Sequence, residues 1–170
     1  MIVIADASPL IVLIKIEEVA ILPKLFGHIL LPQTVASELA DSRRPQAVRD
    51  FIHTPPAWIS VRTVGNSLPL PGLHLGESEA INLARQLSAD LILMDERDAV
   101  ATAREMGLRV VGTVGILERA AQDRLLNLRE AFDRLKATDF WVSPKLLEER
   151  LHLFEQCSRA DRNRPKERER

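Results

Sequence analysis

Hydrophobic and polar positions follow two different periods along this chain, and the periods predict which segments are strands and which are helices. Short apolar or alternating runs predict strands at residues 2–5, 28–32, 57–64, 91–95 and 108–113. Apolar residues spaced three and four apart predict helices at residues 9–27, from Thr34 onward, and at 43–54, 76–89, 96–107, 114–126 and 128–156. Strands and helices that alternate in this way predict a parallel sheet covered by helices on both faces.

The length of 170 residues suits one domain, which we predict over residues 1–156. Net charge is −1, but the last twelve residues, "RADRNRPKERER", hold six basic and three acidic side chains. Because this end is so charged and so poor in apolar residues, we predict a disordered tail over residues 157–170. Cys157 is the only cysteine, which excludes an internal disulfide and a thiolate zinc site.

The chain carries no apolar run long enough to span a membrane. A secretory signal begins with positive charge, whereas this chain reaches Asp6 before any Lys or Arg. We therefore expect a cytoplasmic location.

Carboxylates stand at the ends of two predicted strands. Asp6 follows the first strand and Asp95 ends the fourth. Ligands of an open parallel sheet bind outside the carboxyl ends of its strands, so we expect these two acids to lie close together. Glu38, in the helix after the second strand, and Glu77, in the first turn of the helix before the fourth, are placed to join them. Each close pair of like charges repels by about 4 kcal/mol at an effective dielectric near 20, so such a cluster needs a cation.

Carboxylate oxygens with no His or Cys beside them favour Mg²⁺ or Mn²⁺ over zinc. A carboxylate-held Mg²⁺ can lower the pKa of a bound water, orient a phosphate and neutralise charge on a leaving oxygen. Metal-assisted cleavage of a nucleic acid follows as a hypothesis from the acids alone.

Each acid also has an ordinary structural explanation. Asp6 could cap the helix that begins near Ser8. Glu77 and Glu79 could interact favourably with the positive end of the dipole of their helix. Glu38 and Asp98 could be solvated surface charges. Two strand ends that carry Asp are harder to explain in this way, because an unpaired carboxylate beside a core is costly.

Four segments resemble the PIN domain superfamily of metal-dependent nucleases: "VIADASPLI", "LLPQTVASELA", "LGESEAINLA" and "LILMDERDAVATAREMGLRVVGTVGIL". They are most similar to its compact prokaryotic branch, which is related to the toxin ribonucleases of type II toxin-antitoxin pairs. The resemblance covers residues 1 to about 135, and the motifs occur in the family's order. It implies a three-layer α/β/α fold with a central parallel sheet, here with a helical C-terminal extension, and Mg²⁺- or Mn²⁺-dependent hydrolysis of single-stranded RNA.

The resemblance also implies roles for individual residues. It makes four acids the catalytic residues and metal ligands: Asp6, Glu38, Glu77 and Asp95. Ser8 is the small hydroxyl residue beside the first ligand, Glu79 is the fallback for Glu77, and Asp98 is a possible further carboxylate. The family often has Asp at the third position, so Glu77 departs from the commoner pattern.

A nucleic-acid substrate calls for cationic side chains near the acids. The candidates, each of which could also be a plain surface charge, are Lys15, Arg43, Arg44 and Arg97. Tyr is absent, and Trp58 and Trp141 sit among apolar residues, so we predict that both pack in the core. The sequence therefore gives no hint of a preferred RNA motif. His74, close before Glu77, is a further candidate for the site.

Partners and competing functions complete the predictions. The resemblance implies a small antitoxin partner and a homodimer, and the amphipathic end at residues 128–156 either packs on the sheet or shapes such an interface. A catalytically inactive PIN-like module that binds nucleic acid or regulates is the main alternative. A receiver-like phospho-acceptor domain would also cluster acids at strand ends and would suit Thr113, but it needs a Lys that is absent between Val114 and Leu135.

Overall fold

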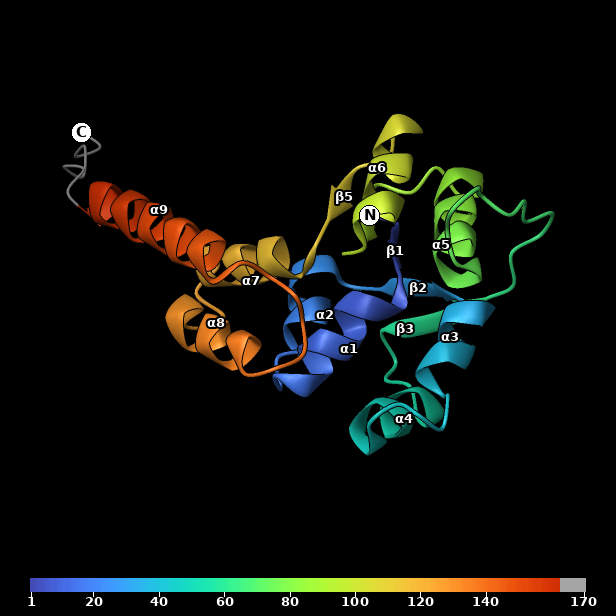
Figure 1. Ribbon diagram of the computed structural model, residues 1–170, viewed down its shortest axis with the longest axis horizontal. Coiled ribbons are helices and arrows are strands. Elements are labelled where there is room, and N and C mark those ends of the chain that lie inside the picture. The colour runs from blue at the N-terminus through green and yellow to red at the C-terminus, as the bar shows by residue number, and fades with distance from the viewer. Residues whose placement is uncertain (163–170) are drawn as a thin grey trace, which may run out of the picture.

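The computed structural model describes residues 1–162. Within them, five strands form one sheet in the order β3-β2-β1-β4-β5, and every neighbouring pair is parallel (Figure 1). The strands are β1 (Val3–Ala5), β2 (Ile29–Pro32), β3 (Ile59–Arg62), β4 (Leu91–Leu93) and β5 (Val110–Val111). All five predicted strands are present, each shorter than predicted.

Helices connect the strands and extend beyond the last one. They are α1 (Ala7–Lys15), α2 (Ile21–Phe26), α3 (Gln33–Leu39), α4 (Gln46–His53), α5 (Leu75–Gln86), α6 (Arg97–Glu105), α7 (Thr113–Gln122), α8 (Leu128–Lys136) and α9 (Pro144–Arg162). The segment at residues 9–27, predicted to form one or two helices, forms two, because the turn between α1 and α2 includes Glu17 at a positive φ of 61°.

The central strands separate two hydrophobic clusters. Successive side chains of a strand point to opposite faces, and in β1 the side chains of Val3 and Ala5 join the cluster beneath α1, α3 and α7, whereas Ile4 joins the one beneath α5 and α6. β1 is completely buried, as continuous apolar strands of parallel sheets are. The predicted three-layer α/β/α architecture is confirmed, and the carboxyl ends of β1, β2 and β4 open on one edge of the sheet.

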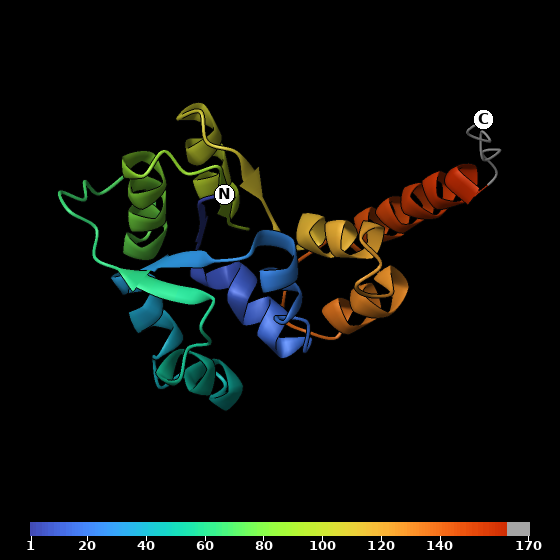
Figure 2. The ribbon, with the colours of Figure 1, turned by 180° about the vertical axis from the view of Figure 1, so that it is seen from behind.

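The C-terminal extension differs from the continuous helical segment predicted over residues 128–156. Helix α8 ends at Lys136, residues 137–143 are not helical, and α9 begins at Pro144. The break has a local cause, since the proline ring is tolerated only in the first turn of a helix. Helix α9 packs on α8 through the buried Leu147 and Leu151 and extends away from the sheet, on the side opposite α5 (Figures 1 and 2).

Two predictions about the chain ends meet the structure only in part. Helix α9 continues past residue 156 to Arg162, and the rest of the predicted tail, residues 163–170, lies outside the described residues. A single domain over residues 1–156 stays a prediction. No helix within residues 1–162 is both long enough and apolar enough to cross a bilayer.

The two tryptophans have different surroundings. Trp58 packs against the core and lies beside Phe51, with 5.8 Å between the ring centroids, as predicted. Trp141 is 92% exposed, so its predicted core position is wrong. Trp141 lies in residues 137–143, the non-helical link between α8 and α9. In such a link, apolar neighbours in the sequence do not define a buried face as they would in a helix.

Candidate functional site

Asp6 ends β1 and immediately precedes α1. Its side chain is only 5% exposed, and its backbone N–H donates to the carbonyl of Leu93 at 2.9 Å, which ties the end of β1 to β4. Asp6 stands at the N-cap position of α1, but its carboxylate accepts no regular capping hydrogen bond from that helix. The side-chain hydroxyl nearest to it is that of Ser8, whose Oγ donates to Oδ2 over a long 3.4 Å. Capping alone therefore does not explain this acid.

Glu38 and Glu77 approach each other across the contact between α3 and α5. Glu38 is half-buried near the end of α3, and Glu77 is 8% exposed in the first turn of α5. The Glu38 carboxylate lies directly against Gly76, so closely that a Cβ atom added to this glycine would overlap Oε1. The Glu77 side chain is held in place by the start of its own helix, because its Oε2 accepts a hydrogen bond from the backbone N–H of His74 at 2.9 Å. The sequence feature that permits this close approach is Gly76, which immediately precedes Glu77 at the start of α5.

Asp6, Glu38 and Glu77 share one electrostatic environment. The pKa of Asp6 is raised to about 6, chiefly by burial and also by the carboxylates of Glu38 and Glu77, while the backbone N–H groups that follow Asp6 act in the opposite direction. The pKa of Glu38 is also raised, first by burial and then by Glu77, against the opposing charges of Arg44 and His74. The fold thus gathers three acids from β1, α3 and α5 into one region, in which the negative charge of Asp6 and Glu38 is disfavoured.

Asp95 lies two residues beyond β4 on the same edge and has different partners. Its Oδ1 accepts a hydrogen bond from the backbone N–H of Thr113 at 2.7 Å, and its Oδ2 accepts one from the Thr113 hydroxyl at 2.6 Å. Burial raises the pKa of Asp95, both bonds from Thr113 lower it, and the neighbouring Glu96 raises it again. The sequence did not predict this pairing; its only signal is a Gly-Thr pair at the start of a helix that follows a strand.

The remaining predicted acids point elsewhere. Glu79 is half-buried, and its Oε2 accepts a hydrogen bond from Thr34 Oγ1 at 2.6 Å. Asp98 is exposed in the first turn of α6. The structure therefore groups Glu77, rather than the fallback Glu79, with Asp6.

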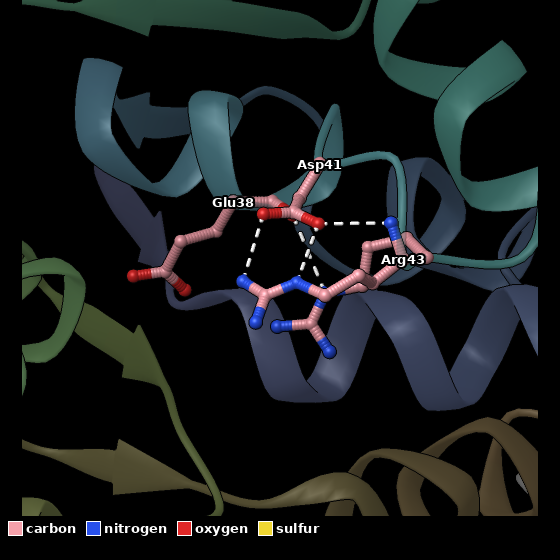
Figure 3. A network of polar contacts seen from close by, with 4 residues as sticks. Glu38, Asp41 and Arg43 are labelled. Atoms are coloured by element: carbon pink, nitrogen blue, oxygen red, sulfur yellow. Dashed lines mark hydrogen bonds and ion pairs between the residues drawn. The ribbon is translucent and has the colours of Figure 1, made fainter.

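Of the predicted cations, Arg44 lies beside this group. Its Nε donates to the backbone carbonyl of Glu38 at 3.3 Å. Arg43 instead faces Asp41 with two side-chain hydrogen bonds of 2.9 Å, which lower the pKa of Asp41. Figure 3 shows this exposed pair, with the Glu38 carboxylate directed away from it.

The other two predicted cations are further from the acids. Lys15 Nζ donates to Asp139 Oδ1 at 2.5 Å and so links the end of α1 to the segment between α8 and α9. Arg97 is exposed at the first position of α6. Neither contacts one of the grouped acids through a hydrogen bond that the structure describes within residues 1–162.

The grouped acids are chemically suited to a hard divalent cation. They offer only carboxylate oxygens, which Mg²⁺ and Mn²⁺ prefer, and a cation would relieve the charge that raises the pKa of Asp6. As the side chains stand, no three His, Cys, Asp or Glu residues within the described part of the chain are arranged to enclose an ion. Asp6, Glu38 and Glu77 are the residues whose carboxylates lie nearest to one another and could hold such an ion.

Comparison with known proteins places the chain in a family. A family model described as DUF3368, a PIN domain, matches residues 2–156. No curated protein and no solved structure matches the chain. The matched span contains every strand of the sheet and all four of the predicted acids.

Proposed function

This chain belongs to the PIN domain family, and from that premise we propose that it is a metal-dependent nuclease that hydrolyses phosphodiester bonds of single-stranded RNA. PIN domains are generally nucleases that act on nucleic acids and typically use divalent metals. The observation that supports the proposal is the convergence of Asp6, Glu38 and Glu77 around a buried carboxylate: burial first, and then the charges of Glu38 and Glu77, raise the pKa of Asp6 to about 6. A protein without a cationic ligand gains nothing from such a group.

In this proposal Asp6, Glu38 and Glu77 hold Mg²⁺ or Mn²⁺, and Asp95 completes the catalytic set from the neighbouring strand end. When bound, the ion lowers the pKa of a water and neutralises charge on the leaving oxygen. Asp95 accepts a hydrogen bond from the attacking water, since a carboxylate that holds two donors still has lone pairs for others. Arg44, beside Glu38, contacts a substrate phosphate.

The test is cleavage of single-stranded RNA in Mg²⁺ or Mn²⁺, with single-stranded DNA in parallel. We expect Asp6→Asn to lower the rate by more than about 100-fold, the upper end for residues that merely support a metal ligand, while circular dichroism stays unchanged. A folded Asp6→Asn protein that cleaves RNA at the wild-type rate would contradict the proposal. A crystal soaked in Mn²⁺ would locate the ion and its ligands by anomalous scattering.

The alternative is a PIN-like module that binds nucleic acid without cleaving it. One observation favours it: within residues 1–162 no three potential ligand side chains are already arranged around an ion site. The same samples discriminate the two functions. Wild-type protein that binds RNA in a filter assay but releases no product with either metal would support the alternative.

We further propose that the protein is the toxin of a type II pair, forms a homodimer and binds a small antitoxin protein. An RNA substrate would place it in the cytoplasm. The exposed Leu146 and Leu153, seven residues apart on α9 and therefore on one face, and the exposed Trp141 support a protein partner here. Sedimentation velocity tests the dimer, and the double change Leu146→Asp, Leu153→Asp should convert a dimer into monomers.

A further inference from the structure

We propose that Thr113 is a positioning residue for Asp95, whose two carboxylate oxygens it holds in the orientation that the reaction requires. This inference rests on the proposed nuclease function, because it concerns the same edge of the sheet. It assigns a role to a residue outside the four acids. It also explains why Asp95, unlike the other three, accepts two hydrogen bonds from one residue.

The contact has the geometry of a clamp. The backbone N–H of Thr113 donates to Oδ1 of Asp95 at 2.7 Å, and the hydroxyl of the same residue donates to Oδ2 at 2.6 Å. Two bonds to two oxygens fix the rotation of the carboxylate, which one bond would leave free. Thr113 is completely buried, so water does not compete for its hydroxyl, and bonds to an ionised acceptor are among the stronger ones in proteins.

The fold builds this clamp from the pairing of β4 with β5. The backbone N–H of Met94 donates to the carbonyl of Val111 at 3.1 Å, which sets Asp95 opposite the start of α7. Gly112 leaves the space that the carboxylate occupies, since a Cβ atom on this residue would lie 2.8 Å from Asp95 Oδ1. The positive end of the α7 dipole then favours the charged form of the acid.

A purely structural role for the same contact is the competing explanation. Asp95 would then serve only to satisfy the first N–H of α7 and to stabilise the helix. The two roles predict different kinetics. Loss of a structural contact lowers the amount of folded protein, whereas loss of a positioning contact lowers kcat in protein that is still folded and still binds RNA.

The experiment compares Thr113→Val with Thr113→Ser. Valine keeps the shape and the backbone N–H but lacks the hydroxyl, so we expect kcat to fall about 10- to 100-fold, with KM changed less than about threefold. Serine keeps the hydroxyl and should recover kcat to within about threefold of wild type. The matched control is Thr34→Val, which removes a hydroxyl bond of the same 2.6 Å length, to Glu79, and should leave kcat unchanged.

A second readout needs no metal and no substrate. Unfolding of the metal-free wild type, Thr113→Val, Asp95→Asn and the double variant forms a double-mutant cycle. We expect the two changes to be non-additive, because each removes the same contact. If wild-type protein cleaves nothing, the proposed nuclease function fails, while non-additivity still supports the clamp itself.

Several results would overturn the proposal. These are additive effects in unfolding, full kcat in folded Thr113→Val, and a Ser variant as slow as the Val variant. If Thr113→Val does not fold, Gly112→Ala replaces it: the added Cβ moves the carboxylate while the hydroxyl remains. A tenfold or greater loss of kcat in this variant supports positioning, and wild-type kcat refutes it.

Discussion

Strands β1 and β4 lie side by side in the sheet and each is followed by an aspartate, yet the two carboxylates have different partners. Burial raises the pKa of both; Asp6 also faces the carboxylates of Glu38 and Glu77, and its pKa is about 6. Asp95 faces two hydrogen-bond donors of Thr113. The position of an acid at a strand end therefore does not define its chemistry, which depends on what the next helix brings against it.

The same contrast separates two acids of helix α5. Glu79 accepts the hydroxyl bond of Thr34, whereas Glu77 is turned toward Asp6 and Glu38 and takes part in their mutual repulsion. Residues two apart on a helix point in different directions. Here Glu79 points toward a hydroxyl donor, and Glu77 points toward two other carboxylates. A threonine hydroxyl thus donates to Asp95 and to Glu79, and the proposed cation would lie among the other three acids, Asp6, Glu38 and Glu77.

The largest expected effect comes from exchanging these two acids for amides. Glu77→Gln removes one charge from the group with Asp6, so we expect RNA cleavage to fall by more than about 100-fold. Glu79→Gln keeps an acceptor for Thr34, so activity should stay within about threefold of wild type. Single-turnover cleavage at saturating Mn²⁺ measures both. The reverse order of effects would mean that Glu79 is the third acid after all.

The next effect is a pH dependence of stability in metal-free protein. The pKa of Asp6 is about 6 in the folded state against 3.8 ordinarily, so between these values the folded protein binds more protons than the unfolded chain. The free energy of unfolding therefore falls as pH rises from about 4 to 6, by roughly 3 kcal/mol for this group. Urea unfolding in EDTA across this range measures the slope.

Asp6→Asn is the control for that slope. The variant should be more stable than wild type at pH 7 without metal and should show a flatter profile. The pH dependence of stability that remains in this variant comes from Glu38 and Asp95, whose pKa values are also raised. An unchanged slope would show that the charge of Asp6 is balanced in the folded protein, and the contrast with Asp95 would then be lost.

A somewhat smaller stabilisation should follow addition of Mn²⁺. At 100 times its dissociation constant, an ion bound only by folded protein contributes about 2.7 kcal/mol, or a rise in Tm of roughly 5–10 °C for a domain of this size. Asp6→Asn should abolish the rise. Asp95→Asn should retain most of it, because both oxygens of that carboxylate already accept hydrogen bonds from Thr113. Differential scanning calorimetry of the three proteins with and without Mn²⁺ measures the six Tm values, and a larger loss in Asp95→Asn than in Asp6→Asn would reverse the comparison.

The sequence predicted the parts of this picture that depend on chain topology. Apolar periodicity predicted the parallel sheet. The rule that ligands gather at the carboxyl ends of strands predicted that Asp6, Glu38, Glu77 and Asp95 would meet. The structure brings the first three together although up to 71 positions separate them, and it pairs Asp95 with Thr113. The match to the PIN domain family confirms the fold that the resemblance implied.

Side-chain partners were the part that the sequence could not provide. The bond from Thr113 to Asp95 and the bond from Thr34 to Glu79 join residues that are 18 and 45 positions apart. Such bonds depend on how helices pack, which hydrophobic periodicity does not specify. The exposure of Trp141 was missed for the same reason, since the link between α8 and α9 has no period of its own. The start of α9 did have a local signal in the sequence, which is Pro144 itself.

The smallest expected effect is on RNA binding, and it concerns two neighbouring arginines, Arg44 beside Glu38 and Arg43 beside Asp41. Arg44 donates to the backbone of Glu38 and opposes the rise in its pKa, whereas Arg43 is already paired with Asp41. If Arg44 contacts an RNA phosphate, Arg44→Ala should weaken binding uniformly across sequences and reduce the slope of log K against log salt by about one. Arg43→Ala should change neither, because an exposed ion pair adds little. Fluorescence anisotropy of labelled RNA at several salt concentrations measures both variants, and equal slopes would move the phosphate contact away from the Glu38 side of the site.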